Sequence, residues 1–198
     1  MTRSEPKATL QRYLQVGRDA MLWKLDGLGE YDIRRPLTPT GTNLLGLIKH
    51  LAGVEAGYFG EVFSRPLAEP MPWDDDEDAD RTVDMWATAN ESRAAISGLY
   101  RRVWTHADQT IEALDLDAIG HVPWWGERGE VTLHQILVHV VAETHRHAGH
   151  ADITRELIDG AVGMRSNSSN MPWTEAAKWT EHYGRVEEAA RLASQTAG

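Results

Sequence analysis

The sequence contains no cysteine among its 198 residues. Disulfide bonds, thiolate-bound zinc, iron–sulfur clusters and a cysteine nucleophile are therefore excluded. Any metal ion that the chain binds must be held by imidazole or carboxylate groups. Any thiol chemistry must use a thiol that the protein binds from outside, because the chain has none of its own.

Basic residues are few compared with acidic ones. The chain has 20 lysines and arginines against 30 aspartates and glutamates, which gives a formal net charge of −10 and a pI near 5.3. A field of this sign repels phosphate groups. We therefore expect neither nucleic acid nor an anionic membrane among the partners of this protein.

Long apolar runs are also missing. No stretch reaches the roughly 18–20 apolar residues that a membrane-spanning helix needs, and the polar residues 1–13 lack the apolar centre of a signal peptide. We therefore expect a cytoplasmic protein. With 41% apolar and 25% charged residues, the chain has the balance of a soluble protein, and its length predicts one domain, residues 1–198.

Apolar residues recur at helical spacing in several segments, whereas no segment alternates in the manner of a strand. The predicted helices cover residues 7–28, 44–64 with Thr42 or Asn43 as the cap, 83–114, 132–160 and 174–194. Pro36 and Pro39 place a loop between the first two, and Thr132 with Gln135 forms a capping-box start for the fourth. The sequence therefore predicts an all-α fold, a four-helix bundle with an additional short C-terminal helix.

Six of the seven residues 74–80 are acidic, and three prolines precede them between residues 66 and 72. A calcium-binding loop is one interpretation of this segment, but the glycine and the terminal glutamate of an EF-hand are absent at the required spacing. The favoured prediction is a solvated loop whose negative charge caps the helix that follows.

Polar groups gather on one face of the predicted helix 132–160. At about 100° per residue, an arc of roughly 80° contains His139, Glu143, His147 and His150. These groups border the apolar stripe, so they should turn toward the bundle interior, where polar groups need partners. His134 and His145 point to nearly the opposite side, and we expect them at the surface or in unrelated packing.

His50 should face the same interior, since it lies between Leu47, Leu51 and Val54 on the apolar stripe of the helix 44–64. A single histidine in such a place is usually a hydrogen-bonded core residue. An acid and a histidine at i and i+4 on one helix, with an inward histidine on another, instead form the usual three-ligand plan for zinc or a similar ion. For the combination, metal binding is the favoured prediction.

Two stretches resemble a known group of proteins. "RPLTPTGTNLLGLIKHLAGVEAGYF" and "TLHQILVHVVAETHRHAGHADITRELIDG" are similar to the actinobacterial branch of the DinB/YfiT-like superfamily, most specifically in "HLAGVE" and "RHAGHAD". The resemblance covers residues 10–173. It implies a four-helix bundle in an up-down-down-up arrangement, with one metal ion at its open end.

The resemblance also implies the ligands, which are His50, Glu143 and His147. Many superfamily members have histidine where Glu143 stands, but the mycothiol-dependent maleylpyruvate isomerase is similar to this chain in using glutamate. That isomerase has a second C-terminal domain for which 198 residues leave no room, so the expectation for this chain is the metal–thiol half of the chemistry. His150 belongs to the motif of the branch, as a ligand or a neighbouring group.

The resemblance implies a metal-dependent S-transferase that uses mycothiol. The hypothesis is that mycothiol binds as a metal thiolate, because metal coordination ionises a thiol, and attacks an electrophilic small molecule. His150 is the candidate for a catalytic base. Zinc is the expected ion, with nickel and iron as alternatives, since His/Glu sites accept several metals. Two other readings stay open: a hydrolase that uses metal-bound water, and a non-catalytic metal-binding bundle.

The electrophile is not predicted, because the loops that shape a pocket are not determined by periodicity. Two tryptophans and several polar residues on predicted loops either frame a pocket or pack the bundle, and none is assigned a role: Trp124, Trp125, Arg165, Asn167 and Asn170. Exposed apolar residues on the first and third helices would also allow a homodimer.

Overall fold

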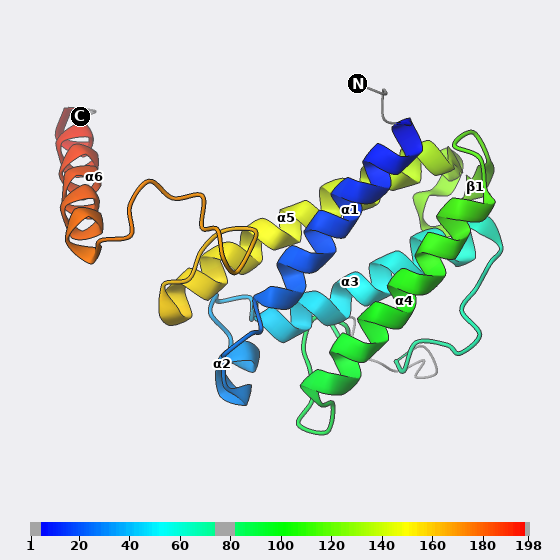
Figure 1. Ribbon diagram of the computed structural model, residues 1–198, viewed down its shortest axis with the longest axis horizontal. Helices are drawn as coiled ribbons and strands as arrows, with labels where there is room; N and C mark the ends of the chain where they lie inside the picture. Colours follow the sequence, from blue (N-terminus) through cyan, green and yellow to red (C-terminus); the bar gives the residue numbers. More distant parts are fainter. Residues whose placement is uncertain (1–4, 74–81, 197–198) are drawn as a thin grey trace.

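Four long helices lie side by side and form the body of the protein (Figure 1). The structure is a computed structural model that describes residues 5–73 and 82–196. The four helices are α1 (Pro6–Trp23), α3 (Leu44–Phe59), α4 (Arg93–Ala113) and α5 (Leu133–Asp159). The ribbon colours show that α1 and α5 run in one direction, while α3 and α4 run in the opposite one. The prediction of an all-α fold is confirmed.

Helices α3, α4 and α5 begin where polar side chains cap them. The Asn43 side chain accepts a hydrogen bond from the Gly46 amide at the start of α3, and Thr132 accepts one from the Gln135 amide at the start of α5. Such caps satisfy amide groups that have no partner within the helix. The predicted start of the fourth helix at Thr132 is therefore confirmed, and its last helical residue, Asp159, precedes Gly160 in a left-handed conformation with φ 79°.

The predicted third helix was too long at its start. Residues 82–92 form turns, and α4 begins only at Arg93, where the Ser92 hydroxyl accepts a hydrogen bond from the Ala95 amide. Glu91 stabilises the preceding turn by accepting a hydrogen bond from the Thr88 amide. These side-chain acceptors offer the backbone an alternative to helix, which helical spacing of apolar residues does not reveal. The acidic run 74–80, predicted as a solvated capping loop, lies outside the described residues.

Short elements complete the fold. The predicted loop between α1 and α3 contains α2 (Glu30–Arg34), and α3 is followed by a 3-10 turn, η1 (Glu61–Phe63). The structure also contains a short hairpin that no alternating pattern indicated: β1 (Ile119–His121) pairs antiparallel with β2 (Glu130–Thr132) around a second 3-10 segment, η2 (Pro123–Arg128). Strands of three residues are too short for an alternating pattern to stand out in the sequence.

The core lies between the four long helices. Its buried apolar side chains come chiefly from α3 and α5, and they include Leu45, Ile48 and Leu51 on α3. Helix α3 packs against both α4 and α5, so it is the central helix of the bundle. Groups on the inner faces of α3 and α5 can therefore meet. Within residues 5–73 and 82–196, no helix combines the length and apolar character that crossing a membrane requires.

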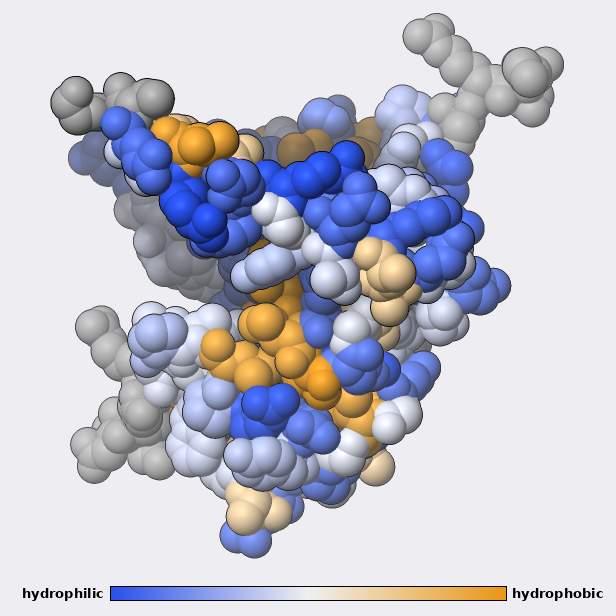
Figure 2. All heavy atoms as spheres, turned by 90° about the vertical axis from the view of Figure 1, so that its left-hand side faces the viewer, coloured by the Kyte–Doolittle hydropathy of each residue, from blue (hydrophilic) through white to orange (hydrophobic). Residues whose placement is uncertain are grey.

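The predicted C-terminal helix is present as α6 (Ala176–Thr196), and it lies apart from the four long helices (Figure 1). Nearly all of its described side chains are exposed, including Tyr183, Val186 and Leu192. Figure 2, which looks onto the left-hand side of Figure 1, shows apolar residues in the hollow at the centre of this face, with polar residues above and below. The single domain 1–198 stays a prediction.

Candidate metal centre

His50 projects from the middle of α3 at the edge of the core. Its neighbours along the helix face, Leu47 and Leu51, are buried, whereas the His50 side chain keeps 22% of its surface exposed. The ring is therefore held by packing on one side and remains open on the other. His50 lies on the face of α3 that turns toward the core, as predicted. Its ring, however, stands at the edge of the core and is partly exposed to solvent.

Glu143 and His147 lie one turn apart on α5, so their side chains project from the same face of the helix. His147 is buried between the apolar residues of this face, while the Glu143 side chain is 24% exposed. Next to them, Thr144 and Ala148 are buried in contact with the rest of the bundle. The packing of α5 therefore turns the pair toward α3 and His50.

The three side chains converge on one point. Glu143 Oε1 lies 2.9 Å from His147 Nε2 and 4.0 Å from His50 Nε2. The rings of His50 and His147 meet edge to face, with centroids 4.9 Å apart. Each residue offers one ligand atom, and these atoms all lie within 4.8 Å of one another. The structure thus brings together the set that the sequence analysis named: His50, Glu143 and His147.

The donor set suits a divalent cation. Zinc binds imidazole nitrogen and carboxylate oxygen at roughly 2.0–2.2 Å, so small side-chain rotations would bring the three donors to one ion. Burial lowers the pKa of His147, and the neighbouring His50 ring lowers it further. A lowered pKa favours the neutral imidazole, whose free lone pair is what a metal ion needs. One carboxylate and two neutral imidazoles would leave further coordination positions for outside ligands.

Asp84 is a neighbour of this centre that the sequence analysis missed. Its Oδ2 atom accepts a hydrogen bond from Nδ1 of His50 at 2.7 Å, and this bond lowers the pKa of Asp84. The apolar spacing predicts this residue inside a helix spanning residues 83–114, whereas it lies in a turn packed on α3. No spacing rule relates it to His50, because 34 residues separate the two.

The other histidines of α5 take different places. His150 is exposed, and its Nδ1 atom lies 3.4 Å from Nδ1 of His147, on the far side of that ring from Glu143. His139 packs against the rings of Tyr58 and Trp125. His134 is exposed, as predicted, and Nε2 of His145 donates to the Tyr13 carbonyl on α1. The role of His150 as a catalytic base stays a prediction.

A cavity of about 370 Å³ opens beside the three converging side chains. Its wall contains His50 and Glu143 themselves, together with glycine, apolar and aromatic residues: Gly53, Val54, Gly57, Tyr58, Trp124 and His139. Gly57 leaves room for Trp124, because a Cβ atom at Gly57 would lie 3.3 Å from that indole ring. Trp124, which had no role predicted from sequence, therefore forms part of the cavity wall from the segment η2.

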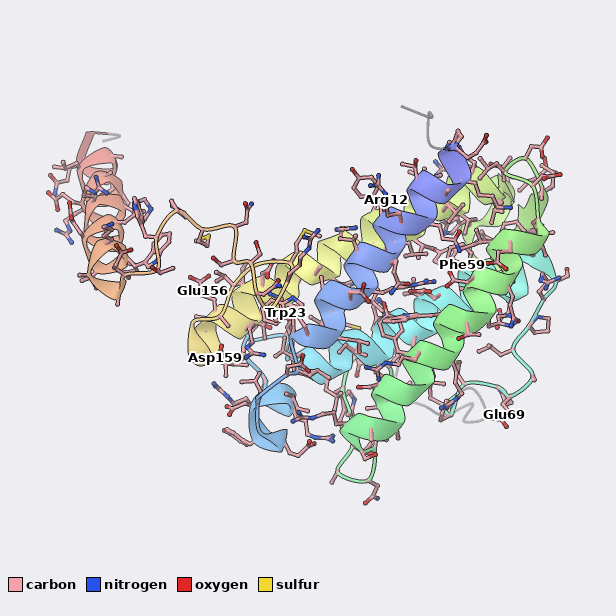
Figure 3. The ribbon with its side chains drawn as sticks, viewed as in Figure 1. Arg12, Trp23, Phe59, Glu69, Glu156 and Asp159 are labelled. Atoms are coloured by element: carbon pink, nitrogen blue, oxygen red, sulfur yellow. The ribbon has the colours of Figure 1, made fainter. Side chains whose placement is uncertain are left out.

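A larger cavity, of about 680 Å³, lies elsewhere, near the C-terminal ends of α1 and α5. It is lined by Trp23 and Glu156, which Figure 3 labels on these two helices, and by small, polar and apolar residues selected from the segment 160–179, none of which is charged. Among its described lining residues, Glu156 is the single titratable group, so it does not offer a set of metal ligands. Size alone therefore does not make it the reactive site, and the smaller cavity beside His50 is the better candidate.

Comparison with known protein families gives a match over most of the chain. A family model described as mycothiol-S-transferase matches residues 9–160, which include all three converging residues. A comparison with curated proteins finds none that matches the chain. The matched stretch ends at the C-terminus of α5, so α6 lies beyond it.

A solved structure has a similar fold. It is described as the crystal structure of a conserved protein from Enterococcus faecalis, and it has a TM-score of 0.58 and 15% sequence identity over 80% of this chain and 99% of that chain. At this level of identity the likeness shows the fold alone.

Proposed function

Since the chain belongs to the mycothiol-S-transferase family, we propose that it is a metal-dependent enzyme that transfers mycothiol to an electrophilic small molecule. The observation that carries the metal dependence is the convergence of His50, Glu143 and His147 from two helices, with their ligand atoms within 4.8 Å of one another. These three residues are the proposed ligands, and zinc is the proposed ion, with nickel and iron as alternatives.

The three residues have distinct tasks in this proposal. His50 and His147 supply neutral nitrogen donors, and the Glu143 carboxylate, which lies between the two rings, supplies one negative charge. When bound, a divalent cation supplies the positive charge that keeps a neighbouring thiol ionised near neutral pH. A free thiol has a pKa near 8.5 and would be mostly protonated there. The absence of cysteine means that no thiol of the chain competes for the site.

The cavity beside the three residues is the proposed substrate site. Gly53 and Gly57 lie one and two turns after His50 on α3 and have no side chains. The helix surface there leaves space for a small molecule to approach the proposed metal ligands. Tyr58 and Trp124 supply aromatic surface, with the indole Nε1 donating to the Tyr58 hydroxyl at 3.4 Å. Aromatic walls exclude water from the reacting atoms, and they suit an electrophile with apolar surface.

His150 is the proposed carrier of the thiol proton. Its exposed ring can exchange protons with solvent, and it contacts the His147 ring through the two Nδ1 atoms. In the transfer, sulfur forms a bond to the electrophilic carbon, the leaving group departs with its electron pair, and the thiol proton passes to a base. Histidine is suited to this task because an imidazole nitrogen can accept a proton and release it again.

The test is an assay of purified protein with mycothiol and a panel of small electrophiles, after loading with zinc. We expect thiol consumption by the wild type, and a loss of at least roughly 100-fold in Glu143→Gln and His147→Ala, in line with the loss of a group that acts in the reaction. The control is His134→Gln, which alters an exposed histidine on the same helix and should retain full activity.

The outcomes separate the alternatives. Hydrolysis of a test ester without added thiol, lost in the same variants, would favour a metal-dependent hydrolase. Tight zinc binding without any turnover would favour a non-catalytic bundle. Full zinc occupancy in both Glu143→Gln and His147→Ala would show that the ligand assignment is wrong.

A further inference from the structure

The turn that contains Asp84 is fastened to α3 by several hydrogen bonds. The Lys49 amine donates to the carbonyl oxygens of Val83 at 2.7 Å and Trp86 at 3.1 Å. The Asn43 amide donates to the Met85 carbonyl oxygen at 3.2 Å. The cap of α3 and its second turn are therefore both joined to one short segment, residues 83–86.

Gly46 and Lys49 determine how closely this segment approaches. A Cβ atom at Gly46 would lie 1.9 Å from the Met85 carbonyl oxygen, a distance that no side chain can accept, so the segment rests directly on the helix backbone. Lys49 is buried and also pairs with Glu91 at 2.8 Å, at the other end of the same loop. Since a buried amine needs partners, it ties both parts of the loop to α3.

The position of the turn brings Asp84 to the outer side of the His50 ring. Asp84 Oδ2 lies 2.7 Å from Nδ1 of His50, and Nε2 on the opposite side of the ring faces Glu143 Oε1 at 4.0 Å. A carboxylate can only accept a hydrogen bond. Nδ1 must therefore carry hydrogen, and in the neutral ring Nε2 keeps its lone pair toward Glu143 and His147.

We propose that Asp84 is a positioning residue of the metal centre, which holds the His50 ring and its Nε2 lone pair toward the ion, and that Gly46 and Lys49 form the cradle that keeps Asp84 in place. This inference depends on the metal centre of the proposed function and deepens it. Carboxylates that accept a hydrogen bond from a metal-binding histidine orient the ring and increase its basicity. Asp84 does not act as a ligand here, because the ring of His50 stands between it and Glu143.

The test is zinc affinity, measured by competition with a chromophoric chelator. Asp84→Ala should weaken zinc binding by roughly 10- to 100-fold, the usual effect of losing such a partner. Asp84→Asn should weaken it less, because the amide oxygen can still accept the hydrogen bond from Nδ1. Asp19→Ala is the control: it removes an equal charge from an exposed position on α1, where Gln15 donates to the carboxylate, and it should leave the affinity unchanged.

Cobalt substitution distinguishes positioning from ligation. At saturating Co²⁺, Asp84→Ala should keep the intensity of the visible absorption bands, because the number of protein ligands is unchanged. A change in intensity that indicates a different coordination number would make Asp84 a ligand and overturn the proposal. Equal zinc affinities of Asp84→Ala and Asp19→Ala would overturn it as well.

The cradle is tested by a double-mutant comparison. Gly46→Ala should weaken zinc binding when Asp84 is present and should add nothing in the Asp84→Ala background, because both changes act through the same contact. Lys49→Met provides a second variant if Gly46→Ala does not fold. Additive losses would overturn the role of the cradle. If the wild type binds no zinc, the metal centre of the proposed function is wrong. If the wild type binds zinc and the Asp84 variants bind it equally well, only the role of Asp84 is wrong.

Discussion

The rings of His50 and His147 each have a hydrogen-bonding group on both sides. Glu143 and Asp84 face the two nitrogens of His50, while Glu143 and His150 face those of His147. Imidazoles flanked in this way cannot rotate freely, so the nitrogen that faces the centre is specified for each. Two carboxylates beside two imidazoles also give the site a negative field, which favours a cation over an anion.

At the same scale, Arg155 and Asp159 join the C-terminal ends of α5 and α1. Arg155 donates to the carbonyl oxygens of Lys24 and Asp26, and it holds both carboxylate oxygens of Asp159 at 2.9 and 2.6 Å. Figure 3 labels Asp159 at this end of α5. The hydrogen bond from Arg155 lowers the pKa of Asp159 below its usual value of 3.8. The folded chain therefore binds fewer protons at this residue than the unfolded chain does.

From this difference we predict an acid sensitivity that depends on Asp159. Its contribution to stability is present above pH 3.8, the usual value, and is lost as the pH falls through the lower pKa of the folded state. Asp159→Asn should therefore reduce the fall in unfolding free energy between pH 5 and pH 3, two values chosen to bracket this range. Urea titrations at several pH values measure it. Asp19→Asn, on exposed α1 surface, is the control, and equal pH profiles of the two variants would contradict the prediction.

At the scale of elements, one buried arginine forms ion pairs with two carboxylates and thereby links three of the four long helices. Arg18 on α1 contacts Glu55 on α3 at 2.6 Å and Asp108 on α4 at 2.9 Å, and the side chains of Arg18 and Glu55 are fully buried. Burial opposes the charge of Arg18, but Glu55 and Asp108 outweigh it and raise the pKa of the guanidinium. Arg18 therefore stays charged, whereas burial raises the pKa of the Glu55 carboxyl against the opposing effect of Arg18. The contact aligns α1 with α3, the helix that carries His50.

We predict that Arg18→Met lowers the unfolding free energy by about 3–5 kcal/mol, because it leaves the Glu55 carboxylate buried without its partner. Arg18→Met combined with Glu55→Leu should recover most of this loss, since an apolar pair no longer requires hydration. Urea-induced unfolding measures both.

The matched control for this pair is Arg191→Met on α6, which breaks a contact with Glu188 at 2.8 Å between side chains that are 57% and 55% exposed. An exposed pair contributes about 0–1 kcal/mol. A loss in Arg18→Met no larger than that of Arg191→Met would show that the buried pair does not hold the helices.

At the scale of the whole molecule, the helical bundle and α6 differ in how far their side chains are buried and in whether the family model covers them. Residues 9–160 match the family model and contain the proposed centre, whereas α6 lies beyond that stretch. The apolar side chains of Tyr183, Val186 and Leu192 on α6 are more than half exposed. Exposed side chains contribute little hydrophobic free energy to folding, so the stability of the bundle should depend only weakly on this helix.

We therefore predict that removal of residues 175–198 leaves the bundle folded and able to bind zinc. The loss should stay within about 1 kcal/mol, which corresponds to a melting temperature lowered by no more than about 4 °C. Circular dichroism melting and zinc competition measure the two properties. A melting temperature lower by 15 °C, or a loss of zinc binding, would show that α6 supports the bundle in a way that its exposure does not indicate.

Several features of the site could be predicted from sequence because they depend on short separations. Glu143 and His147 share a face because four residues separate them on one helix, and Thr132 begins that helix through a bond to Gln135. Asp84 could not be predicted. Its contact with His50 depends on the turn at residues 82–92, on the close approach at Gly46 and on the bonds of Lys49, which join segments more than thirty residues apart.

The sequence by itself determined three features of this protein: the types of donor atom that a metal ion must use, the helical spacing of the apolar residues, and the polar caps of the helices. Each depends on which residues are present or on hydrogen bonds between residues a few positions apart. Helical spacing alone left several histidines of α5 open, and the tertiary structure places His147 against His50, as the family resemblance implied. Only the tertiary structure decided that Asp84 supports the His50 ring and that Trp124 lines the cavity beside it. These outcomes depend on how helices and loops pack, and packing sums many weak contacts between distant segments that no local pattern records.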